Sequence, residues 1–231
     1  MKESEILKRI YPSVVTFVGN WRSMVKEVGE YKLKEISLFV TAANYTERKK
    51  IYQALEKTSV QKIPHVHIRH DMREAEMDYL VSRFQSKVFT AHAQYFLKYF
   101  KNSKYRKNIF IENNNGQSTI KNISDLKLAG GCCIDLAHFE QFRFKSKKYY
   151  ELTKEIAKIY PIGCNHLSAV LPDGQSWHRV KQISDLNYLK NIPQQYFSKY
   201  INLELANPIK EQLEFKKYIA KILTKQWNKK S

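Results

Sequence analysis

The sequence predicts a single α/β domain folded as a (β/α)₈ barrel, a parallel barrel whose strands alternate with helices. Eight short apolar runs recur along the 231 residues, and a polar or amphipathic segment of helical length follows most of them. Parallel strands require crossover helices that cover the sheet, which accounts for this alternation. Hydrophobic residues make up 43% of the chain, and no linker or low-complexity stretch divides it. We therefore expect residues 1–231 to form one domain.

Four expected strands lie in the first half of the chain, where β-branched and aromatic residues cluster. The first run ends at Gly19-Asn20, a pair typical of turns. In the third run, period-two alternation puts His65 and His67 on one face of the strand. The expected strands are Val14–Gly19, Glu35–Thr41, Lys62–His70 and Lys87–His92, with helices over Trp21–Tyr31, Thr46–Glu56, Glu74–Phe84 and Tyr95–Arg106.

The second half of the chain repeats the pattern. Cys133 shares a strand face with Asp135, and Cys164 shares one with His166, so both cysteines are expected one layer deeper in the barrel. Tyr160-Pro161 ends a helix, because proline cannot continue it. The expected strands are Asn108–Gln117 (including a polar loop after Glu112), Gly130–Asp135, Ile162–Ser168 and Tyr200–Ala206, with helices over Ile120–Leu128, Tyr149–Ile159, a segment interrupted at Pro193, and Ile209–Trp227.

The chain is strongly basic, with 40 Lys and Arg against 22 Asp and Glu and a formal charge of +18. Such a charge fits a polyanionic partner, DNA or another phosphorylated substrate, although a general lysine bias of composition would also produce it. We interpret Arg48, Lys49 and Lys50 as a solvated helix face rather than an anion site. No run resembles a signal peptide or a membrane span, so we expect a cytoplasmic protein without a membrane partner, with its three cysteines as thiols.

Imidazole and carboxylate side chains stand at the ends of the third to the eighth expected strands. An ionised carboxylate such as Asp135 at the end of a buried strand needs a cation or hydrogen-bond partner. The carboxyl ends of barrel strands meet at one rim, which carries the active site in barrel enzymes. Six such groups exceed the needs of one tetrahedral ion, so we predict at least two metal ions with a bridging carboxylate. The six residues are His65, His92, Glu112, Asp135, His166 and Glu204.

Basic residues after the strands are candidates for binding phosphate. Arg143 and Lys145 belong to a stretch after Asp135 in which basic and aromatic residues alternate, as they do where proteins contact nucleic acid. A solvated loop and helix start is the alternative interpretation of that stretch. Arg69 and Arg179 complete the expected phosphate-binding set.

These motifs together resemble the strand-end motifs of the endonuclease IV family. Members of that family are apurinic/apyrimidinic endonucleases within the xylose-isomerase-like barrel superfamily. The segments that carry the resemblance are Ile111-Glu112-Asn113 with Gly116-Gln117, Cys133-Ile134-Asp135 with His138, His166-Leu167, and Leu203-Glu204 with Asn207-Pro208, and Pro64-His65 and His92 match in order and position.

The resemblance implies a hydrolase that uses two or three Zn²⁺ ions to cleave DNA 5′ to an abasic site, as in DNA repair. Clustered ions would bind the phosphodiester and supply a hydroxide nucleophile. Glu112 and Glu204 are the expected catalytic residues. Carried over by position, His65, His92 and Glu112 hold the first ion, Glu112 bridges to a second ion held also by Asp135, His166 and Glu204, and His138 and His178 hold the third.

One departure from the family concerns the third ion. The family has an aspartate two residues before its last histidine, and this chain has Ser176 there. The pattern also leaves open whether His67 or His70 takes part, whether DNA, RNA or a sugar phosphate is the substrate, and the oligomeric state.

Two other functions remain open. The first is a sugar or sugar-phosphate isomerase or epimerase of the same superfamily, with one Mn²⁺, Mg²⁺ or Co²⁺ and with Glu112 and Glu204 as proton-transfer bases. That function needs Asp135 and His166 as further ligands but leaves His65 and His92 without a role. The second is a basic barrel that binds nucleic acid or metal without turnover, for which Ser176 is the main argument.

Overall fold

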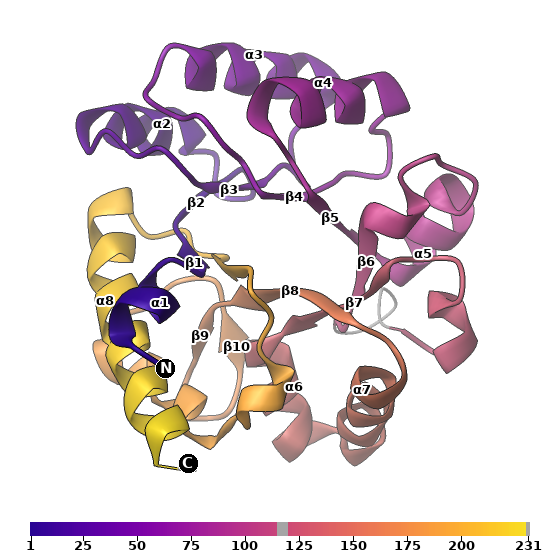
Figure 1. Ribbon diagram of the computed structural model, residues 1–231, viewed down its shortest axis with the longest axis vertical. Helices are drawn as coiled ribbons and strands as arrows, with labels where there is room; N and C mark the ends of the chain where they lie inside the picture. Colours follow the sequence, from indigo (N-terminus) through magenta and orange to yellow (C-terminus); the bar gives the residue numbers. More distant parts are fainter. Residues whose placement is uncertain (115–119, 230–231) are drawn as a thin grey trace.

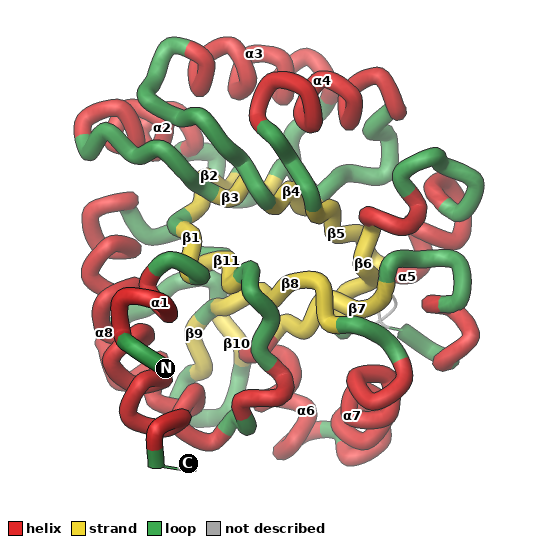
Figure 2. The backbone as a smooth tube through the Cα atoms, in the orientation of Figure 1, coloured by secondary structure: helices red, strands yellow, loops and turns green. Residues whose placement is uncertain are grey.

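Parallel strands form a nearly closed barrel flanked by helices in the computed structural model, which describes residues 1–114 and 120–229 (Figure 1). The strands lie in a ring and the helices lie outside it (Figure 2). Among the described residues nine strands belong to this sheet, in the order β1 (Ile10–Tyr11), β11 (Ile201–Leu203), β8 (Ile162–Leu167), β7 (Gly131–Asp135), β6 (Ile109–Glu112), β5 (Val88–His92), β4 (His65–His67), β3 (Ser37–Phe39) and β2 (Ser13–Val15).

The expected count of eight strands is not confirmed, because two short strands stand where one was expected. β1 pairs with β11 and β2 pairs with β3, so the two ends of the sheet are joined by Pro12 alone. Proline has no N–H to donate to a ladder, which explains the interruption. The first strand was expected over Val14–Gly19, but β2 ends at Val15, and Gly19 adopts φ 72° in the turn before the next helix.

Helices cover the outside of the ring, and five of them match their expected ranges within two residues: α2, α3, α4, α7 and α8. In place of the expected helix Tyr95–Arg106, the chain forms the short helix α5, a π-helical turn and a 3₁₀ turn. Helix α6 occupies the basic and aromatic stretch after Asp135, for which a solvated loop and helix start was the alternative interpretation. None of the described helices is both long and apolar enough to cross a membrane. The bounds are α1 Glu3–Leu7, α2 Trp21–Glu30, α3 Tyr45–Glu56, α4 Glu74–Phe84, α5 Ala93–Tyr95, η1 Phe96–Phe100, η2 Arg106–Asn108, η4 Ile123–Leu126, α6 Leu136–Lys145, α7 Lys147–Ile159, η5 Ile183–Asn191, η6 Gln194–Tyr196 and α8 Ile209–Asn228, and a small antiparallel pair is formed by β9 (Ala169–Val170) and β10 (Ser176–Trp177).

The prediction that Arg48 lies on a solvated helix face is wrong. Its side chain is completely buried, and Nε and Nη2 donate to the two carboxylate oxygens of Glu76 at 2.6 and 2.9 Å. Nη1 donates to Asp71 at 2.9 Å, and Tyr52 donates its hydroxyl to Glu76. The sequence pattern could not predict this network, because Asp71 and Glu76 follow the next strand and lie more than 20 residues from Arg48 in the chain.

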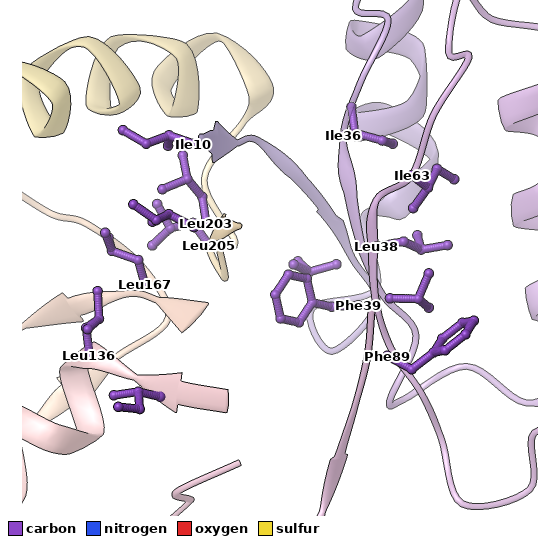
Figure 3. Packing of buried hydrophobic residues seen from close by; sticks show 14 of the residues in the cluster. Ile10, Ile36, Leu38, Phe39, Ile63, Phe89, Leu136, Leu167, Leu203 and Leu205 are labelled. Atoms are coloured by element: carbon purple, nitrogen blue, oxygen red, sulfur yellow. The ribbon is translucent and has the colours of Figure 1, made fainter. Parts of the chain in front are cut away.

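The hydrophobic core lies inside the barrel and between the strands and the helices. Residues such as Leu38, Phe89 and Leu203 belong to one large buried cluster (Figure 3). A second, small cluster fills the barrel toward the amino ends of the strands and contains Cys133 and Cys164, which pair in register. The expectation that these cysteines lie one layer below the ligand residues is therefore confirmed, and all three cysteines are free thiols.

Candidate metal centre

The carboxyl ends of the strands bring the expected imidazole and carboxylate groups together. His92 ends β5 and pairs in register with Glu112, which ends β6. Asp135 ends β7 and pairs in register with His166 of β8. Glu204 directly follows β11. All are buried except His92, whose side chain is 20% exposed, so the rim predicted from the sequence is present in the structure.

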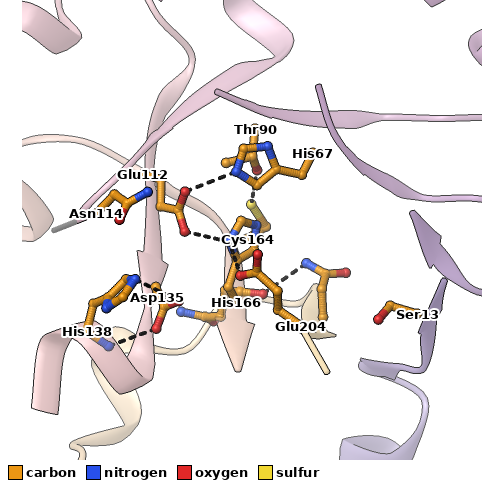
Figure 4. Close-up of polar contacts among 12 residues, drawn as sticks. Ser13, His67, Thr90, Glu112, Asn114, Asp135, His138, Cys164, His166 and Glu204 are labelled. Carbon is orange, nitrogen blue, oxygen red and sulfur yellow. Dashed lines mark hydrogen bonds and ion pairs between the residues drawn. The ribbon is translucent and has the colours of Figure 1, made fainter. Parts of the chain in front are cut away.

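One group of potential ligands consists of His67, His92 and Glu112. Oε2 of Glu112 lies 3.1 Å from Nε2 of His67 and 3.2 Å from Nε2 of His92. The rings of the two histidines meet edge to face, with centroids 5.0 Å apart. Figure 4 shows the Glu112 carboxylate pointing toward His67 on this side.

A second group uses the other oxygen of Glu112. Oε1 lies 2.9 Å from Nδ1 of His166, and the same nitrogen lies 3.2 Å from Oε2 of Glu204 (Figure 4). Asp135 completes this group, in which one ligand atom from each of the four residues lies within 4.8 Å of every other. Glu112 therefore belongs to both groups, one oxygen in each.

The donor set fits a divalent cation. Three carboxylates, those of Glu112, Asp135 and Glu204, are buried together, and burying ionised groups is costly unless a positive charge compensates them. Among the described residues Oδ2 of Asp135 has no hydrogen-bond partner, as expected of an oxygen that serves a cation. Imidazole nitrogen and carboxylate oxygen are the donors that Zn²⁺ and related ions take. The clusters could therefore hold metal ions.

Electrostatics in the second group couple His166 to the carboxylates of Glu112 and Glu204. Burial on its own would lower the pKa of His166, but Glu112 and Glu204 raise the pKa well above its usual value. Burial would raise the pKa of Glu112, but His166, His67 and His92 hold the pKa well below its usual range. Glu112 is thus held as a carboxylate.

Asp135 and Glu204 respond differently to the same surroundings. Burial raises the pKa of Asp135 and outweighs the opposite effect of His138. For Glu204, burial is outweighed by His178 and His166, which lower the pKa to about 2. In the absence of a metal, Asp135 is therefore the carboxylate least compensated by its neighbours.

The resemblance implied that His65 joins His92 and Glu112. In the structure His67, not His65, lies in that group. His65 lies one layer deeper, and its Nε2 is 2.8 Å from Oγ1 of Thr90 and 3.2 Å from Nε2 of His166. Both β4 histidines are buried inside the barrel, as alternation predicted, but they occupy different layers. With Cys164 and His166, His65 forms a third group of potential ligand atoms.

The residues expected around a third ion are arranged differently. His138 lies in the first turn of α6, and its Nδ1 is 3.0 Å from Oγ of Ser176, which donates to Gln141 at 2.8 Å. The rings of His138 and His178 are 6.5 Å apart and perpendicular, and His178 packs on Phe17. Among the described residues, no group of three close ligand atoms contains His138 or His178.

The expected phosphate-binding residues are dispersed. Arg69 follows β4 and forms an ion pair with Asp71 at 2.7 Å. Arg143 donates to Glu140, and both Arg143 and Lys145 are exposed about 10 Å or more along α6 from its start. Arg179 is exposed in the loop after β10. Of these four residues only Arg69 lies within two residues of the end of a barrel strand.

Two asparagines contact residues of the site, and sequence reasoning assigned a role to neither of them. Asn113 exchanges hydrogen bonds with the backbone of Asp135, at 2.6 and 3.3 Å, and so fixes the end of β7. Asn114 Nδ2 lies 2.8 Å from Nε2 of His92. Their place directly after the ligand Glu112 was the available signal. Gly116 and Gln117, which contributed to the resemblance, lie outside the described residues.

Comparisons of the chain with protein-family models, with curated proteins and with solved structures found no match.

Proposed function

We propose that this chain is a metal-dependent phosphodiester hydrolase that resembles endonuclease IV and acts on nucleic acid, with abasic-site DNA as the expected substrate. The observation that carries the proposal is the position of Glu112. Its two oxygens face two different ligand groups, His67 with His92 on one side and His166 with Glu204 on the other. A shared carboxylate of this kind suits a pair of ions.

A pair of ions, when bound, would bind the phosphate oxygens and stabilise both the attacking and the leaving oxygen. The chain's own residues would hold that pair in place. His67, His92 and Glu112 would hold one ion, and Glu112, Asp135, His166 and Glu204 would hold the other. Zn²⁺ suits the mixed imidazole and carboxylate donors, with Mn²⁺ or Mg²⁺ as alternatives.

The charge of the chain supports a polyanionic substrate. A formal charge of +18 raises the local concentration of nucleic acid and speeds its association. Among the four expected phosphate-binding residues, Arg69 lies nearest in the chain to a barrel strand end, two residues after β4, and we propose it as the phosphate contact beside the metal groups. We propose the closed eight-stranded (β/α)₈ barrel for the fold, with β1 and β2 counted as one strand interrupted at Pro12.

The test is incision of a duplex that contains one abasic site, after removal of metal and reconstitution with Zn²⁺ or Mn²⁺. We expect a nick 5′ to the abasic site and no cleavage of the intact duplex. Glu112→Gln should abolish incision, whereas His70→Gln should not, because His70 packs against Tyr95 and Tyr99 outside the ligand groups. Incision that survives Glu112→Gln, or no incision by a fully metal-loaded protein, would contradict the proposal.

A sugar or sugar-phosphate isomerase or epimerase is the second candidate. The compact set of Glu112, Asp135, His166 and Glu204 favours it, because those four residues suffice for a single ion. Conversion of an aldose phosphate to its ketose by the Mn²⁺-loaded protein, without incision of DNA, would replace the first proposal by this one.

A further inference from the structure

His65 and His166 contact each other ring to ring inside the barrel. Their Nε2 atoms are 3.2 Å apart, the ring planes are inclined by 70°, and both side chains are completely buried. At this distance two lone pairs would repel each other, and so would two N–H groups. One nitrogen must therefore carry a proton and the other must accept it.

The other nitrogen of His166 decides which of the two carries the proton. Nδ1 of His166 faces Oε1 of Glu112 and Oε2 of Glu204, so it is the nitrogen that would bind an ion in the second group. A neutral histidine that binds a metal through Nδ1 has its only N–H at Nε2. With an ion in place, Nε2 of His166 must donate to Nε2 of His65.

We propose that His65 is a positioning residue for His166: it accepts the Nε2–H of His166 and thereby fixes the tautomer and ring orientation in which Nδ1 binds metal. This inference rests on the proposed metal centre. Metal-binding histidines commonly donate their second N–H to a partner, and losing that partner typically weakens metal binding 10- to 100-fold. Here the partner is a second imidazole rather than a carboxylate or a backbone carbonyl.

This role leaves the other ring nitrogen of His65, Nδ1, without a hydrogen-bond partner among the described residues. If Nε2 of His65 accepts, its Nδ1 carries the proton. An unsatisfied buried donor is destabilising. A histidine that only fills the core would be better with its proton on Nε2, donated to Thr90 at 2.8 Å. The two roles therefore predict opposite tautomers of His65.

Long-range ¹H–¹⁵N correlation of the zinc-loaded protein, labelled at histidine, distinguishes the two roles directly. We expect His166 protonated at Nε2 and His65 protonated at Nδ1. A proton on Nε2 of His65 would overturn the proposal. This readout needs no substitution and no substrate, so a failure of DNA incision would leave it unaffected.

Zinc affinity of variants provides the second measurement. His65→Leu should weaken Zn²⁺ binding by about 10- to 100-fold without changing the number of ions, and His65→Gln, whose amide oxygen can accept, should recover most of the affinity. Thr90→Val removes the hydroxyl beside the same nitrogen and should leave the affinity nearly unchanged. Wild-type affinity in His65→Leu would contradict the proposal.

The same variants detect a different use of the cluster. An ion held by His65, His166 and Cys164 would appear in the Co²⁺-loaded protein as a thiolate-to-cobalt charge-transfer band that disappears in Cys164→Ser. Cys132→Ser is the matched control, because Cys132 faces Pro161 rather than the barrel interior. We expect no such band. Its appearance would show that a metal ion, rather than a proton, lies between the rings of His65 and His166, and would overturn the proposal.

Discussion

Oε1 of Glu112 lies 2.9 Å from Nδ1 of His166, although strand β7 separates the strands that carry the two residues. The contact spans the neighbouring strand because both side chains point into the barrel. The opposite oxygen of Glu112 faces His67 and His92. This one carboxylate therefore links the two ligand groups.

His67, rather than His65, should complete the first ion site. We expect His67→Gln to remove one of two bound ions, because only His92 and the shared Glu112 would remain in that group. Removing a direct ligand should cost at least about 100-fold in affinity, the upper range for outer-shell partners. Zinc per chain after dialysis measures this. Two tightly bound ions in His67→Gln would show that His67 is not a ligand.

Metal binding at the second group should strengthen as the pH rises. The pKa of His166 lies well above its usual 6.5, despite burial, because of Glu112 and Glu204, so the metal-free ring is protonated at neutral pH. An ion must displace that proton, and we expect about one proton released per ion bound at this group. Calorimetry in two buffers of different ionisation enthalpy counts the protons. A pH-independent affinity would contradict the prediction.

The same raised pKa affects the metal-free fold with a definite sign. A group whose pKa is higher in the folded state stabilises that state fully below its unfolded pKa, near 6.5 for His166. That contribution is lost as the pH rises through the folded-state pKa. As the pH rises from about 6.5 toward the folded-state pKa of His166, we expect the free energy of unfolding of the metal-free wild type to decrease. The decrease should be smaller in His166→Gln, and urea unfolding measures both.

Arg48 should be essential for stability but not for metal binding. Arg48→Ala leaves Glu76 buried without its cation, and breaking a buried pair in this way costs about 3–5 kcal/mol. Lys50→Ala, on the exposed face of the same helix, should change stability by less than about 0.5 kcal/mol. Urea unfolding compares the two. Equal effects of the two substitutions would disprove the structural role of Arg48.

A carboxylate in place of Ser176 should let His138 and His178 hold a further ion. The Ser176 hydroxyl lies 3.0 Å from Nδ1 of His138, at the position where the proposed resemblance to endonuclease IV expects a carboxylate. We expect Ser176→Asp to raise the number of bound zinc ions by one, because it would add an anionic ligand beside His138 and His178. Ser176→Ala, which adds no ligand, is the control. An unchanged count in Ser176→Asp would contradict this prediction.

The sequence predicted which strand ends carry the site, because strand alternation and the common rim of a parallel barrel are local and topological rules. It did not predict the layer of each histidine. His65 and His67 share a face, and only the stagger of β4 against β5 places His67 beside His92. The alternation of side chains along one strand does not predict how far that strand is shifted relative to its neighbour.

A second failure has the same physical origin, and a third has a different one. The ion pair of Arg48 with Glu76 joins neighbouring helices, and no local pattern announces it. The start of α6 did carry a signal that was not used: Asp135 caps the helix by accepting from the backbone N–H of His138, the spacing expected of an N-cap aspartate. That capping explains why His138 is held beside Asp135 even with a serine at position 176.

The most direct test of the shared role of Glu112 is anomalous diffraction from crystals of the protein loaded with Zn²⁺. We predict two zinc peaks on opposite sides of the Glu112 carboxylate, one beside His67 and His92 and the other among Asp135, His166 and Glu204. A single peak within the second group, with none beside His67, would contradict a shared carboxylate and favour a one-metal enzyme.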